Sequence, residues 1–135
     1  MKELTHLGIW MDHSYAYLME TKANVIVTNC IVSETMLQDH ERSLNEGHKH
    51  VDFNDTFKRE KQERANYYSK ISEVIRNYKE VIIFGPTDAK SELLNLLEAD
   101  HLFSKIKIEK KDADKMTENE MHALVIAYFK EKHLA

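Results

Sequence analysis

Very little in this sequence of 135 residues interrupts or cross-links the chain. It contains one cysteine, one proline and three glycines. Because Cys30 stands alone, an intrachain disulfide and a Cys-x-x-Cys metal site are both excluded, which suits a reducing, cytoplasmic setting. The scarcity of glycine and proline leaves little room for flexible linkers. We therefore expect residues 1–135 to form a single domain.

Long apolar runs and a positive net charge are also absent. No apolar run approaches the roughly 18 residues that a transmembrane helix needs, and Met1–His6 lack the apolar core of a signal peptide. With 19 Lys and Arg against 23 Asp and Glu, the net charge of −4 is no overall electrostatic footprint for nucleic acid. We expect a cytoplasmic protein that binds neither membranes nor DNA.

The sequence does contain a regular succession of apolar segments. Leu7–Met11 and Tyr15–Met19 are separated by Asp12-His13-Ser14, a pattern that predicts a β-hairpin with a polar turn. The run Ala23–Val32 is rich in β-branched residues and predicts a third strand. Cys30, within this strand, is expected to be a small buried hydrophobe.

A long loop and a long helix follow the three strands. Ser33–Asp55 has little periodicity and predicts a loop, and loops this long inside a compact domain are often functional. In Thr56–Lys79, apolar or cationic residues recur every three or four positions, which predicts a helix. Asn54 or Asp55 is the expected cap of its first turn.

The second half of the chain predicts two more strands and two more helices. These are a buried strand at Val81–Phe84, a helix that Thr87 or Asp88 caps, a strand near the sheet edge around Ile106 and Ile108, and a last helix opened by the capping box Thr117–Glu120. The resulting order, β-β-β-loop-α-β-α-β-α, predicts an α/β fold with a mixed five-stranded sheet. Right-handed crossovers make this a three-layer α/β/α domain.

The stretch Phe84–Asp88 joins a strand to a helix, where a phosphate-binding loop would lie. Such a loop needs several glycines and a Gly-Lys-Ser/Thr end, whereas here Gly85 is followed by Pro86, which has no N–H to donate. Asp88 would also place a negative charge beside the phosphate. Gly85 and Pro86 are therefore expected to form a sharp turn, with the helix starting immediately after it.

The same stretch resembles a known family. A strand followed by Gly85-Pro86-x-x-Ala-Lys90-x-Glu-Leu, after a long helix with a Tyr-Tyr pair, resembles the central domain of archaeal and eukaryotic class-I release factors and Pelota. It looks closer still to small bacterial single-domain relatives, the release-factor-like translational machinery proteins. These begin with a strand ending Trp-x-Asp-His, as here at Asp12 and His13, and carry a histidine-rich loop. The resemblance implies an RNase-H-like sheet of five strands in the order 3-2-1-4-5.

The family's catalytic motif is missing. Release factors carry Gly-Gly-Gln at the tip of the loop before the long helix, where it assists peptidyl-tRNA hydrolysis. The corresponding region here, Asn45–His50, has one glycine and no glutamine. Peptide-release chemistry is therefore not implied, and a non-enzymatic role is favoured.

The leading functional hypothesis is a non-catalytic, translation-associated module that binds the ribosome or RNA. The contacts would come from the 33–55 loop and from the basic face of the following helix, because cations neutralise backbone phosphates. The candidate residues are Lys49, Lys58, Arg59, Lys61, Arg64 and Lys70. Tyr67 is a candidate for base stacking, whereas Tyr68 fits the apolar stripe and is favoured as a core residue.

Two alternatives remain open. His40, His48 and His50, with Asp39 or Asp52, are candidate ligands of zinc or another divalent metal, in a metal-binding protein or a metal-dependent hydrolase. Asp12 lies where RNase-H-type nucleases keep a metal-binding aspartate, but no acid ends the fourth strand in register, so Asp12 is favoured as a turn residue. The other alternative is a homo-oligomeric interaction domain.

Overall fold

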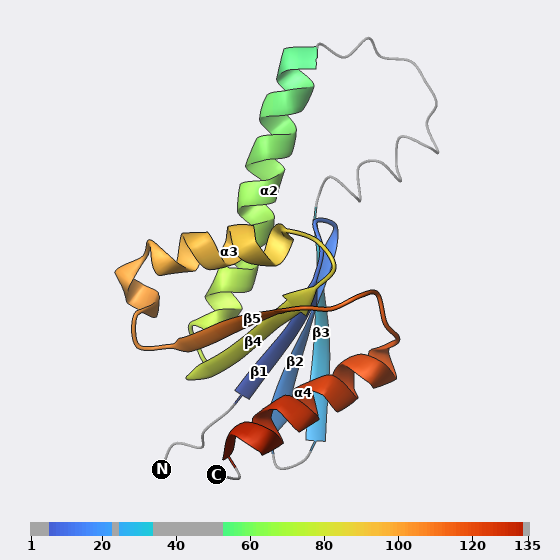
Figure 1. Cartoon of the computed structure of the whole chain (residues 1–135). Helices are drawn as coiled ribbons and strands as arrows, with labels where there is room; N and C mark the ends of the chain where they lie inside the picture. The colour runs from blue at the N-terminus through green and yellow to red at the C-terminus, as the bar shows by residue number, and fades with distance from the viewer. Residues whose placement is uncertain (1–5, 23–24, 34–52, 134–135) are drawn as a thin grey trace.

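The chain folds around a mixed sheet of five strands in the order β3-β2-β1-β4-β5 (Figure 1). It is seen here in a computed structural model that describes residues 6–22, 25–33 and 53–133, with the backbone alone for residues 22, 53–60 and 132–133. The strands are β1 His6–Met11, β2 Tyr15–Lys22, β3 Val25–Val32, β4 Glu80–Gly85 and β5 Lys107–Asp112. β1, β2 and β3 pair antiparallel, while β4 runs parallel to both β1 and β5.

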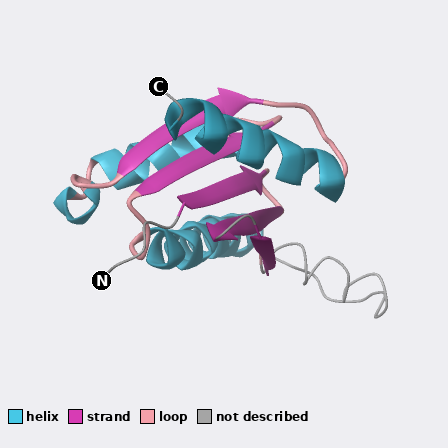
Figure 2. Cartoon of the chain, turned by 90° about the horizontal axis from the view of Figure 1, so that it is seen from below, coloured by secondary structure: helices cyan, strands magenta, loops and turns pink. Residues whose placement is uncertain are grey.

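Three α-helices are present in the described part of the chain. They are α2 Phe53–Ile75, α3 Ala89–Glu98 and α4 Glu118–His133, and a short 3-10 helix, η1 His101–Phe103, follows α3. Helices α2 and α3 cover one face of the sheet, and α4 covers the other (Figures 1 and 2). The predicted three-layer α/β architecture and the strand order 3-2-1-4-5 are therefore confirmed.

The sheet separates two apolar cores because side chains alternate between its faces. Ile9 and Ile83 point toward α2 and α3, whereas Trp10 and Phe84, one position further along, point toward α4. Helix α4 approaches β1 closely at Gly8, where a Cβ atom would lie 2.3 Å from a methyl group of Val125. The strands β1 and β4, covered on both faces, form the centre of the molecule.

The structure corrects both ends of the long helix and one burial expectation. Helix α2 ends at Ile75 rather than at Lys79. Helix α2 begins at Phe53, so the expected caps Asn54 and Asp55 lie inside its first turn; acidic residues are well tolerated there because the helix N-terminus is partly positive. Cys30 is exposed rather than buried. A run of β-branched residues predicts a strand but not its position in the sheet, and β3 is an outer strand among the five that the structure describes.

The helices of the described part include none that is both long enough and apolar enough to cross a membrane.

Candidate functional site

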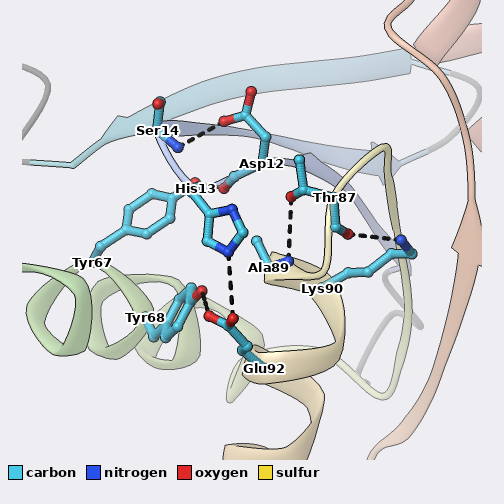
Figure 3. A network of polar contacts seen from close by, with 9 residues as sticks. All are labelled: Asp12, His13, Ser14, Tyr67, Tyr68, Thr87, Ala89, Lys90 and Glu92. Atoms are coloured by element: carbon cyan, nitrogen blue, oxygen red, sulfur yellow. Dashed lines mark hydrogen bonds and ion pairs between the residues drawn. The ribbon is translucent and has the colours of Figure 1, made fainter. Parts of the chain in front are cut away.

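The carboxyl ends of β1 and β4 lie side by side, because these two strands are parallel neighbours in the sheet. Asp12 and His13 follow β1, and Pro86 and Thr87 follow β4 on the way into α3. In open α/β sheets, ligands bind beyond the carboxyl ends of such strands. The two segments that the sequence singled out, Asp12-His13 and Gly85–Lys90, are thus brought together at the place where a site is expected (Figure 3).

Asp12 organises the turn between β1 and β2. Its Oδ1 atom accepts hydrogen bonds from the backbone N–H of Ser14 at 2.7 Å and of Tyr15 at 2.9 Å. Its backbone carbonyl accepts a further hydrogen bond from the Tyr67 hydroxyl at 2.9 Å. The carboxylate therefore stabilises the turn, which is a common role of Asp at this position of a hairpin.

Gly85 lets β4 approach β1 more closely than another residue would allow. A Cβ atom at Gly85 would lie 2.0 Å from the backbone oxygen of Met11. After the exposed Pro86, the Thr87 hydroxyl accepts a hydrogen bond from the Ala89 N–H at 3.2 Å, whereas Asp88 makes no side-chain cap. The stretch is a tight turn with a helix cap.

Lys90 is a buried cation on the first turn of α3. Its Nζ atom donates to the backbone carbonyl of Thr87 at 2.8 Å and lies 3.0 Å from Oδ1 of Asp112, at the end of β5. The Lys90 side chain is 6% exposed and that of Asp112 98% exposed, so the ion pair is solvated at one end. Lys90 therefore fastens the start of α3 to the neighbouring strand ends rather than reaching into solvent.

Glu92 connects three elements at this edge. Its Oε1 accepts a hydrogen bond from the Tyr68 hydroxyl at 2.6 Å, and its Oε2 lies 3.4 Å from Nε2 of His13 (Figure 3). Burial acts to raise the pKa of Glu92, but the hydrogen bonds from Tyr68 and His13, and the charges of His13 and Arg64, outweigh it and lower that pKa. His13, Arg64, Tyr68 and Glu92 are called the His13–Glu92 cluster below.

Sequence reasoning missed Glu92 as the centre of this cluster. Tyr68 and His13 are 24 and 79 residues away from it along the chain, and nothing in the local pattern predicts those contacts. The one available signal was its place in the quoted motif Ala-Lys90-x-Glu-Leu, on the first turn of the predicted helix.

The three α2 cations whose side chains are described do not form one face. Lys61, Arg64 and Lys70 are exposed, while Glu63 between them is buried. At about 100° of helical rotation per residue, Lys61 and Arg64 lie within about 60° of each other, and Lys70 lies about 120° around the helix from Arg64. Lys61 and Arg64 share a flank with Tyr68, and the charge of Arg64 acts on both Tyr68 and Glu92. Lys70 lies on another side.

The remaining candidate cations are less completely placed. Lys58 and Arg59 belong to α2, in the part for which the backbone alone is described. Lys49 lies outside the described residues, as does most of the predicted loop. Their roles in binding stay predictions.

Tyr67 is not available for base stacking. Its side chain is 1% exposed and that of Tyr68 is 4% exposed. Burial, together with the nearby charge of Asp12, raises the pKa of the Tyr67 hydroxyl, so it acts as a neutral donor to the Asp12 carbonyl. The stacking hypothesis for Tyr67 is therefore wrong, and the expectation that Tyr68 belongs to the core is confirmed.

The metal hypothesis falls mainly on residues that the structure does not describe. His40, His48 and His50 lie outside the described residues. Within residues 6–22, 25–33 and 53–133, no three His, Cys, Asp or Glu side chains come together as a metal site. Zinc or another divalent metal at the three histidines stays a prediction.

The fold is similar to that of solved archaeal proteins. No protein-family model matches the sequence, and no curated protein matches it either. Pelota from Archaeoglobus fulgidus superimposes on 98% of this chain with a TM-score of 0.57 at 10% identity. Pelota from Thermoplasma acidophilum superimposes on 95% with a TM-score of 0.55 at 15% identity. An archaeal translation termination factor matches 96% of the chain with a TM-score of 0.48 at 15% identity.

These similarities establish the fold that the chain shares with a part of Pelota. The chain spans about a third of the length of each Pelota protein, 32% in both cases. At such low identity, the activity and partners of the longer proteins do not transfer with the fold. The expected structural resemblance to the Pelota domain is thus confirmed at the level of architecture.

Proposed function

We propose that this protein is a non-catalytic, translation-associated module related to the central domain of class-I release factors and Pelota. It binds the ribosome or RNA through residues 33–55 and the cations of α2. The support from the fold is the similarity to two Pelota structures over nearly the whole chain. The support from chemistry is the charge of the α2 surface.

The observation that carries the proposal is the burial of Glu63 beside exposed cations. From Lys61 to Ile75, the part of α2 whose side chains are described, the exposed charged side chains are those of Lys61, Arg64 and Lys70, against one exposed acid, Glu73. Because Glu63 is only 4% exposed, the surface of this helix is more basic than its sequence. A cationic surface of this kind attracts phosphate backbones and releases their counterions.

Lys61 and Arg64 are the best placed of these cations. Tyr67 contacts the carbonyl of Asp12 at the carboxyl end of β1, so residues before Tyr67 lie on the part of α2 that extends past the sheet (Figure 1). Lys61 precedes Tyr67 by six residues, about 9 Å along the helix axis. A projecting helix end with two neighbouring cations can enter a groove of a large RNA without steric conflict from the sheet.

A non-catalytic role fits the contacts at the strand ends. The Asp12 carboxylate is used by backbone N–H groups of its turn, and Lys90 is buried against Thr87 and Asp112. His13 and Glu92 contact each other, and Glu92 also accepts from Tyr68. Each of these polar groups is explained by a structural contact.

The test is sedimentation of the tagged protein with ribosomes in native lysate at low and high salt. We expect co-migration with a ribosomal subunit at low salt and its loss at high salt. The double variant Lys61→Glu/Arg64→Glu should lose co-migration, because two phosphate contacts are replaced by repulsion. With purified RNA, removal of two contacts should reduce the slope of log K against log salt by roughly 1.4–1.8.

The matched control is Lys105→Glu/Lys130→Glu, which makes the same change in net charge at two exposed lysines away from α2. It should co-migrate as the wild type does. Free migration of the wild type at both salt concentrations would contradict the proposal, and so would equal loss in the control, because binding would then follow net charge alone.

A further inference from the structure

The two outer strands of the sheet differ in how they are protected. Among the described residues, β3 has one strand neighbour, β2, with which it makes eight consecutive residue pairs from Lys22↔Val25 to Tyr15↔Val32. β5 is the outer strand on the other side and pairs with β4. An outer strand presents a row of backbone N–H and C=O groups that can pair with another chain.

Strand β5 carries the features that prevent such pairing. Its sequence, Lys-Ile-Glu-Lys-Lys-Asp, contains five charged residues in six. Pairing with a copy of itself would bring lysines together, and charged side chains, lysine above all, are the usual protection of an edge. This side of the sheet is therefore blocked electrostatically.

Strand β3 carries none of these features. Its sequence, Val-Ile-Val-Thr-Asn-Cys-Ile-Val, has no charged residue, no proline and no glycine over eight residues. Val25 and Val27 are 60% and 49% exposed. A long, uncharged outer strand with exposed valines is a template on which a strand of another chain can pair.

We propose that β3 pairs antiparallel with β3 of a second copy of this chain, which joins the two sheets into one. The partner is a second copy of the chain because two β3 strands can pair without electrostatic repulsion, since β3 has no charged residue. A two-fold axis relates the two copies, so that β3 of each copy forms one side of the interface. The strand is also long enough for a regular antiparallel ladder. The second copy would therefore pair at the β3 edge of the sheet and not at the charged β5 edge.

The alternation of side chains restricts the register. Ile31 packs toward α2 and α3, and Ile26 packs toward α4, so Val25, Val27 and Asn29 share the face of Ile31. A two-fold axis perpendicular to the sheet keeps each face of the joined sheet continuous. Odd-numbered residues of one β3 strand must then lie opposite odd-numbered residues of the other, and even-numbered opposite even-numbered. We assign the axis to Val27, which then faces Val27 of the second copy, with Val25 opposite Asn29.

The interface should be weak. With the axis at Val27, residues 25–29 of the two strands oppose each other. Pairing of this length, with few side chains to bury, lies at the small end of protein interfaces, below about 1,200 Å². We therefore expect a weak, reversible dimer whose formation depends on protein concentration.

The first test is size-exclusion chromatography with light scattering over a concentration series. The wild type should shift from monomer to dimer, whereas Val27→Lys, which places lysines opposite each other, should remain monomeric. Leu102→Lys is the matched control, since Leu102 is a similarly exposed apolar residue, 57% exposed, on η1; it should dimerise as the wild type does. A wild type that stays monomeric at every concentration would overturn the proposal. This holds whether the β3 edge is then occupied by residues 34–52 or by a different peptide.

The second test measures the register through the one cysteine. Cys30 lies on β3 and is exposed, so a spin label can be attached to the otherwise unchanged chain. Since Cys30 is three residues from Val27, the two labelled Cα atoms should be about 20 Å apart across the axis. A dimer with labels beyond about 40 Å would contradict the strand pairing, given the same 3.3–3.4 Å rise per residue.

Discussion

At the scale of single residues, the two glycines of the central strands are distinguished by what a side chain would meet. At Gly85 the obstacle is the backbone oxygen of Met11, 2.0 Å from the Cβ position. At Gly8 the obstacle is the side chain of Val125, whose Cγ2 lies 2.3 Å away. A backbone atom inside a sheet cannot move aside, whereas a side chain can be shortened.

This difference predicts two kinds of destabilisation. Gly85→Ala should lower the free energy of unfolding by about 2–3 kcal/mol, because overpacking forces the strands apart. Gly8→Ala should also lower the free energy of unfolding. The loss in the double variant Gly8→Ala/Val125→Ala should be smaller than the sum of the losses in the two single variants, because the shorter side chain at position 125 makes room for the new Cβ atom. Urea unfolding of the wild type, Gly85→Ala, Gly8→Ala, Val125→Ala and Gly8→Ala/Val125→Ala measures this. A Gly85→Ala protein within about 0.5 kcal/mol of the wild type would show that the β1–β4 approach is not a constraint.

The contacts of the His13–Glu92 cluster show where residue-scale prediction ends. Asp12 was expected to organise its turn, because an Asx turn depends on residues two and three positions away. The bond from Tyr68 to Glu92 depends instead on the rotation of α2 and α3 about their axes and on their separation. Those quantities are set by packing on the sheet, and no local pattern contains them.

At the scale of elements, Glu92 fastens α3 to α2 and to the end of β1. The Tyr68 and His13 contacts and the Arg64 charge lower its pKa below the ordinary value of 4.5. A carboxyl whose pKa is lower in the folded protein stabilises the fold above its unfolded pKa, and the contribution is lost as pH falls through the folded pKa. The docking of these elements should therefore weaken in acid.

The prediction is tested by titration of the Glu92 carboxyl by carbon NMR. Its midpoint should lie below 4.5 in the wild type and rise in Tyr68→Phe, because the hydroxyl that donates to the ionised form is removed. The stability difference between wild type and Glu92→Gln should shrink as pH falls, and Glu98→Gln, an exposed site on the same helix, controls for the loss of one charge. Equal midpoints in wild type and Tyr68→Phe would contradict this account.

The elements themselves were largely predictable, with errors that have physical causes. The capping box formed as expected: Thr117 N–H donates to Glu120 at 2.9 Å, and Glu120 N–H donates to the Thr117 hydroxyl at 3.2 Å. The start of α2 was placed too late, because polar residues fit both a cap and a first helical turn. The content of β-branched residues located β3, but its place at the edge came from the family resemblance, and the exposure of Cys30 followed from neither.

At the scale of the whole molecule, the two proposed surfaces lie at opposite ends of the sheet. Val27 pairs with Glu20, and Glu20 pairs with Leu7 near the start of β1. The cationic end of α2 lies beyond Asp12, where Tyr67 contacts the carboxyl end of β1. Leu7 and Asp12 are five residues apart along the chain, about 17 Å in an extended strand.

Substitutions separated by this distance usually have independent effects. We therefore expect Val27→Lys to co-sediment with ribosomes as the wild type does, and Lys61→Glu/Arg64→Glu to dimerise with an unchanged dissociation constant. Ribosome sedimentation and light scattering on both variants measure the four outcomes. If Val27→Lys also lost ribosome binding while its fold, judged by circular dichroism, stayed intact, independence would be wrong. Binding would then require two copies, each adding its cations to one RNA surface, and affinity would depend on avidity rather than on α2 alone.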